Sequence, residues 1–163
     1  MRESVEALIG RVRTALGADW LPELYRTKVR TMRTRAYTLD IRGPERSPDI
    51  LHTLLGIELK AGKRRFACPD LATARYIRIF ARIGAAEFAI PYDISKISMI
   101  ADELETSWQR TLLVASEVCS RRPPRSAALL ITKLIGEMRS EIAEIGAGEP
   151  MPVFDTKTRQ RKK

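Results

Sequence analysis

The chain has 163 residues, 44% of them hydrophobic and 30% charged, so it can bury the core of one globular domain. It carries 29 Lys and Arg against 20 Asp and Glu, which gives a formal net charge of +9 at pH 7. It has no apolar run of membrane-spanning length and no apolar stretch near its N-terminus that would mark a signal peptide. We therefore expect a cytoplasmic protein that is not bound to a membrane.

The N-terminal part of the chain mixes clear and ambiguous patterns. Residues 3–16 have apolar side chains at helical spacing, and Gly17 ends the predicted helix. Residues 20–35 fit a helix or a strand, and they contain one acid, Glu23, among cations. These cations are Arg26, Lys28, Arg30, Arg33 and Arg35. Residues 37–41 alternate apolar and polar side chains, which predicts a short strand that ends before Gly43-Pro44.

Residues 47–68 contain two further signals. Ser47-Pro48-Asp49 is typical of a helix N-terminus, so we expect a helix over residues 47–56 that Gly56 ends. Residues 57–61 and 64–68 then flank Gly62-Lys63, which predicts a β-hairpin with a two-residue turn. The expected register sets Ile57 against Cys68 and Leu59 against Phe66 on the apolar face. The polar face then holds Glu58, Lys60, Arg65 and Ala67.

The rest of the chain is predicted to be mostly helical. Asp70 precedes a helix over residues 71–83 that carries a basic stripe of Arg75, Arg78 and Arg82. A short strand at 88–90 follows, and Asp93 begins a helix that runs to about Cys119. Two prolines in residues 120–125 break that helix, and a last helix covers residues 126–145.

These elements predict an α/β fold in which a small mixed sheet with a central hairpin is flanked by helices, followed by two long C-terminal helices that pack together. Residues 1–147 would form this single domain. Residues 148–163 have no periodicity and an excess of cations, so we expect a basic, disordered tail.

The charge excess comes mainly from arginine, whose guanidinium forms bidentate hydrogen bonds with phosphate and stacks on bases. We therefore expect DNA or RNA as the partner, with a purely solubilising charge as the alternative. The expected contacts are the cations of residues 26–35, the basic stripe of residues 75–82, and Lys63 and Arg64. Trp20, Tyr25 and Tyr37 flank the first group and could stack on bases, although aromatic residues belong to the core more often.

A resemblance to a nuclease superfamily rests on Pro48-Asp49, on Glu58-x-Lys60, on the helix after Asp70 and on the strand at 88–90. This order, over about residues 37–90, resembles the PD-(D/E)XK superfamily of restriction endonucleases and Holliday-junction resolvases. The resemblance implies that Asp49 and Glu58 bind Mg²⁺ and that Lys60 is the catalytic lysine. Asp40, on the preceding predicted strand, is the alternative carboxylate. Residues two apart on a strand share a face, so Glu58 and Lys60 would lie together.

Other interpretations of the same residues stay open. Glu58, Lys60 and Arg65 also fit a solvated hairpin face with a cross-strand ion pair. The chain would then be a non-catalytic nucleic-acid-binding protein or an interaction scaffold, and its C-terminal helices could form a homodimer. His52 is the single histidine, which leaves no Ser-His-Asp or Cys-His triad to assemble. Cys68 and Cys119 lack ligand partners at zinc-site spacing and are expected to be reduced and buried.

Overall fold

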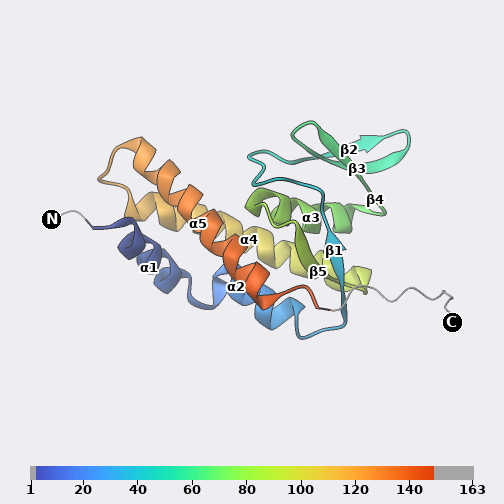
Figure 1. Ribbon diagram of the computed structural model, residues 1–163, viewed down its shortest axis with the longest axis horizontal. Helices are drawn as coiled ribbons and strands as arrows, with labels where there is room; N and C mark the ends of the chain where they lie inside the picture. The colour runs from blue at the N-terminus through green and yellow to red at the C-terminus, as the bar shows by residue number, and fades with distance from the viewer. Residues whose placement is uncertain (1–2, 149–163) are drawn as a thin grey trace.

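The computed structural model describes residues 3–148, which form a layer of helices, a two-stranded sheet and a three-stranded sheet (Figure 1). The α/β class and the long C-terminal helices are confirmed. The helices are α1 (Val5–Leu16), α2 (Leu21–Leu24), α3 (Leu71–Ile83), α4 (Ile94–Val118) and α5 (Pro124–Ile145). The strands are β1 (Thr34–Thr38), β2 (Asp49–Thr53), β3 (Gly56–Ala61), β4 (Arg64–Cys68) and β5 (Glu87–Pro91). Among residues 3–148, no helix has an apolar stretch of the length that a bilayer crossing requires.

Helix α4 is the central element, because it packs against α1, α3 and α5 (Figure 1). Asp93 caps its N-terminus by accepting a hydrogen bond from the Ser95 amide at 3.0 Å. Its apolar positions recur every three or four residues and are buried from Ile97 to Ala115. Helix α5 lies beside it with Leu130, Leu134, Met138 and Ile142 buried, so the two C-terminal helices pack within the chain. Both nevertheless expose a leucine, Leu113 on α4 and Leu129 on α5.

The segment between α1 and β1, whose sequence fits a helix or a strand, is helical at first and ends in a strand. A 3₁₀ turn (Gly17–Asp19), α2 and a π-helical turn (Tyr25–Val29) come first, and β1 begins at Thr34. The strand expected at residues 37–41 therefore lies earlier in the chain, at Thr34–Thr38. Leu39 and Ile41 lie beyond its end, where they remain buried in the core.

Strands β1 and β5 form an antiparallel two-stranded sheet with Ala36 opposite Ala89. The outer edge of β5 is covered by side chains instead of a third strand. The Tyr76 hydroxyl donates to the Ala89 carbonyl oxygen at 2.6 Å, and the Ala89 amide donates to the Tyr25 hydroxyl oxygen at 2.8 Å. Tyr25 in turn donates to the carbonyl oxygen of Gly146 at 2.8 Å. Two phenols thus satisfy the free backbone groups of Ala89 and connect β5 to the chain after α5.

Strands β2, β3 and β4 form the second sheet, an antiparallel meander that lies over α3 (Figure 1). The predicted hairpin is confirmed, including the pairing of Leu59 with Phe66 and of Ile57 with Cys68. Leu59, Ala61 and Cys68 are buried on the face toward α3.

Two expectations about this region are wrong. Residues 49–53 form β2, paired with β3, and not the helix expected over residues 47–56. The strands also form two antiparallel sheets and not one mixed sheet. Strand β2 pairs with β3 of the hairpin, whereas β5 pairs with β1.

The remaining expectations concern the ends of elements and the tail. Helix α5 begins at Pro124, two residues before the expected Ser126, because proline is well tolerated in the first helical turn. Helix α3 and its end at Gly84 are confirmed, as are the two free, buried cysteines. The basic tail expected at residues 148–163 lies, except for Gly148, outside the described residues.

Candidate functional site

The predicted catalytic residues lie on the outer face of the three-stranded sheet, which we define by Asp49, Leu51, Glu58, Lys60, Arg65 and Ala67. Residues directly opposite each other on neighbouring strands share a face. Lys60 on β3 stands opposite Asp49 on β2 and opposite Arg65 on β4. Glu58 stands one same-face position further along β3, opposite Leu51. The sheet register therefore brings Asp49, Glu58 and Lys60 onto one surface.

The two candidate carboxylates differ in their surroundings. Glu58 is largely covered, with 19% of its side chain exposed, and lies 3.4 Å from the Arg65 guanidinium. Asp49 is exposed, and its carboxylate accepts a hydrogen bond from the Ile50 amide at 3.0 Å. Asp40, the alternative carboxylate, is bound by Arg64 in an exposed ion pair. The pairing with Lys60 thus favours Asp49 over Asp40 as the partner of Glu58.

A pocket of about 360 Å³ adjoins this face, lined by residues 45–47 together with Asp49, Lys60 and Gly62. It adds Glu45, which the sequence did not mark as a site residue. A side chain at Gly62 would come within 3.0 Å of the Glu45 carboxylate, so that acid lies directly against the β3–β4 turn. The Glu45 amide donates to the Ala81 carbonyl at 3.0 Å, which fixes the loop on the end of α3.

The donor set on this face suits a hard cation better than a soft one. Asp49 and Glu58 supply carboxylate oxygens, and Mg²⁺ is commonly bound by one or two carboxylates while it keeps several waters. Within residues 3–148, no group of three His, Cys, Asp or Glu side chains lies close enough to hold a metal ion. A divalent ion here would therefore depend on two carboxylates, and Arg65 would have to release Glu58.

The predicted basic stripe on α3 is directed toward α4. Arg75 is bound to Asp102, and Arg82 lies 2.9 Å from the Glu105 carboxylate. Arg78 lies between them; burial, together with the neighbouring Arg82 charge, lowers the pKa of its guanidinium. Two of the three arginines thus join α3 to α4, which leaves Arg78 without an ion pair among the described residues.

The cationic run at residues 26–35 is divided in the fold. Arg26 is bound to Glu23, and Lys28 lies 3.7 Å from Glu103. The Arg30 guanidinium lies 3.4 Å from the Thr34 hydroxyl. The last two arginines stack on aromatic rings, Arg33 on Tyr92 and Arg35 on Tyr37, with 5.0 Å and 5.6 Å to the ring centroids. These five side chains do not form one continuous phosphate-binding strip.

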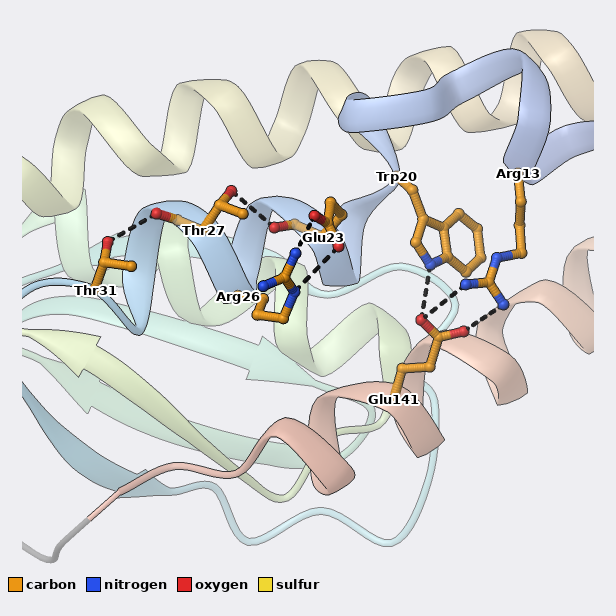
Figure 2. A network of polar contacts seen from close by, with 7 residues as sticks. All are labelled: Arg13, Trp20, Glu23, Arg26, Thr27, Thr31 and Glu141. Atoms are coloured by element: carbon orange, nitrogen blue, oxygen red, sulfur yellow. Dashed lines mark hydrogen bonds and ion pairs between the residues drawn. The ribbon is translucent and has the colours of Figure 1, made fainter.

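The polar network around Glu141 explains why Trp20 is not a base-stacking platform (Figure 2). Trp20 is 3% exposed, and its indole N–H donates to Glu141 at 2.9 Å. The Arg13 guanidinium lies 2.8 Å from the other oxygen of Glu141. Glu141 thereby holds α1 and the following turn against α5. Tyr25 is also fully buried, so both residues belong to the core.

No protein-family model matches the chain, and no curated protein or solved structure is significantly similar to it. What the protein can do must therefore follow from its own side chains.

Proposed function

We propose that the protein binds DNA or RNA through the hairpin cation cluster, which we define as Arg46, Lys60, Lys63 and Arg65. The observation that carries this proposal is the placement of Lys60 directly opposite Arg65 across β3 and β4. Like charges at opposite positions of an antiparallel pair destabilise a sheet. A phosphate bound between them would relieve that repulsion. Arg46 shares the pocket with Lys60, and Lys63 occupies the adjoining turn.

The ion pairing of the four cations supports the same partner. Arg46, Lys60 and Lys63 form no ion pair with any described residue, and Arg65 has a single contact with Glu58 at 3.4 Å. These cations are exposed side chains on the three-stranded sheet, its β3–β4 turn and the loop before β2. A β-ribbon with exposed cations can follow a nucleic-acid backbone without reading its bases. We therefore expect binding without sequence preference.

The test is fluorescence anisotropy with labelled duplex DNA and with labelled RNA at several salt concentrations. The log of the binding constant should fall with the log of salt, by about 0.9 per phosphate contact on duplex DNA. The Lys60→Ala/Lys63→Ala double variant should weaken binding and reduce this slope by about 2. The matched control is Lys96→Ala/Lys133→Ala, which removes two exposed cations from α4 and α5.

Equal slopes for the two double variants would refute the cluster as the binding surface. Absence of binding at low salt would refute nucleic-acid binding altogether. Light scattering on the same samples would then show whether the chain self-associates as a scaffold.

A second candidate function is Mg²⁺-dependent cleavage of the bound strand, and the shared face of Asp49, Glu58 and Lys60 favours it. Bound there, Mg²⁺ would supply an activated water and neutralise phosphate charge. Asp49 and Glu58 would hold the ion, while the Lys60 ammonium would contact the phosphate. The pocket beside Lys60 has room for a phosphate group.

Cleavage and binding can be separated by isosteric changes. Asp49→Asn and Glu58→Gln should each abolish Mg²⁺-dependent cleavage of a labelled substrate. The Glu58→Gln variant should bind nucleic acid more tightly, because Arg65 loses its carboxylate partner. If the wild-type protein binds but leaves the substrate intact in Mg²⁺, the nuclease proposal fails and the binding proposal stands.

A further inference from the structure

The turn between β2 and β3 presents two leucines to solvent. Leu54 is 106% exposed and Leu55 is 94% exposed, more than any other large apolar side chains in residues 3–148. The turn is ordered by its neighbours. The Leu55 amide donates to the Thr53 hydroxyl oxygen, which itself donates to the Gly56 carbonyl, both at 3.1 Å. Gly56 closes the turn at φ 126°, a conformation that suits glycine.

These leucines contribute nothing visible to the fold. Turn positions normally carry Gly, Asn, Asp or Ser, which favour the required backbone conformations and stay solvated. A leucine at such a position exposes its whole side chain to water, and here two stand side by side at the end of a hairpin. The core under this sheet is made by other residues, among them Leu59 and Cys68. The apolar tip is therefore available to a partner.

We infer that Leu54 and Leu55 form an apolar wedge that enters the base stack of duplex DNA held by the hairpin cation cluster. This inference rests on the proposed function, since the cluster supplies the phosphate contacts. Apolar side chains such as leucine on DNA-binding proteins enter base steps and partly unstack them, which kinks the duplex. Such a wedge needs only one or two side chains, which is what the tip offers.

The dimensions of the sheet fit this arrangement. Lys60 in the cluster lies four positions along β3 from Gly56, at the base of the tip. At about 3.3 Å per residue, the tip and the cluster are roughly 13 Å apart. That distance corresponds to about four base-pair steps at ~3.4 Å each. The cations can therefore contact phosphates on the same duplex whose bases the leucines enter.

Charge complementarity distinguishes DNA from a second copy of the chain. A stable protein–protein interface buries about 800 Å² on each partner, far more than two leucine side chains provide. The cluster on the same sheet would also meet its own positive charge in a face-to-face dimer. DNA can contact both parts of this surface, because its phosphates can bind the cation cluster while its bases contact the leucines.

The test uses a duplex with 2-aminopurine at a central TA step, because such steps unstack readily and 2-aminopurine fluoresces more strongly when unstacked. Wild-type protein at saturation should raise the fluorescence. The Leu54→Ser/Leu55→Ser double variant should bind with an unchanged salt slope but lose the fluorescence rise. Its thermal midpoint should equal that of the wild type, because both side chains are exposed. The matched control, Leu113→Ser/Leu129→Ser, should retain the rise.

The outcomes separate the wedge from the proposed function. Binding without a fluorescence rise in the wild type, or a rise that survives in the Leu54→Ser/Leu55→Ser variant, overturns the wedge and leaves binding intact. Binding of RNA without binding of DNA overturns the wedge and leaves the proposed function intact. Absence of binding to both DNA and RNA, together with leucine-dependent binding to vesicles of anionic phospholipid, overturns both proposals and assigns the tip to a lipid surface.

Discussion

Replacing Gly84 by alanine should destabilise the protein far more than a typical Gly-to-Ala change. Gly84 ends α3 at φ 83°, a left-handed conformation that costs a non-glycine residue about 1–3 kcal/mol. A Cβ atom there would also lie 2.5 Å from the Pro44 nitrogen and 2.8 Å from the Gly43 carbonyl carbon. Backbone atoms cannot rotate away, so the loop must shift, and overpacking of this kind costs about 1–3 kcal/mol. The expected total loss is therefore about 2–6 kcal/mol.

The assay is urea denaturation followed by circular dichroism, with Gly17→Ala as the matched control. Gly17 also has a positive φ, 55°, but a Cβ atom there would meet nothing within 4 Å. The control should lose only the free energy of unfolding that the positive φ costs an alanine, about 1–3 kcal/mol. Equal losses in the two variants would refute the close packing of the loop on Gly84. Since that loop also carries Arg46 of the hairpin cation cluster to the pocket, the Gly84→Ala variant should bind nucleic acid more weakly at a given salt concentration.

Three further changes probe the polar contacts of the core. Tyr76→Phe removes the donor to the Ala89 carbonyl and should cost about 1–3 kcal/mol in urea denaturation, and a loss below the error of the assay would contradict that bond. Glu141→Gln should shift the Trp20 emission and lower stability, whereas Glu137→Gln on the same helix, whose contact with an arginine spans 3.9 Å, should do neither. Burial raises the pKa of Tyr76 well above its ordinary value, so the unfolded chain loses this proton first as pH rises. Stability should therefore be fully present below about pH 10 and fall above it, and unchanged stability at pH 11 would contradict this assignment.

The hairpin could be predicted because its information is local. Gly62 permits the turn, the flanking residues alternate, and the partners lie within twelve positions of one another. Strand β2 could not be predicted in the same way. Ser47-Pro48-Asp49 is a strong local helix signal, and the apolar residues that follow fit a helix face. Pairing with β3 decides otherwise, since a helix would leave the second edge of β3 without backbone partners.

The same error limited what the sequence could indicate about the site. Because Asp49 was expected on a helix, nothing in the sequence indicated that it lies opposite Lys60. The sequence therefore could not decide whether Asp49 or Asp40 is the carboxylate that acts together with Glu58. The register makes that distinction, because Asp49 pairs with Lys60 while Asp40 is bound by Arg64. Glu45 carried no signal, since an acid in a charged loop is ordinary and its position depends on the contact with α3.

The attachment of the three-stranded sheet through α3 has a consequence for dynamics. Its contacts with the rest of the fold go mainly to that one helix, whereas α4 is held from several sides. Such a meander can open as a unit while the helices stay folded, because local unfolding follows the boundaries of packed substructures. Amide protons of β2–β4 should then exchange with solvent faster than those of α4. A sheet that can open without unfolding the helical layer can tolerate substitutions at its turns. Such a surface can therefore acquire new binding partners while the helical layer stays the same.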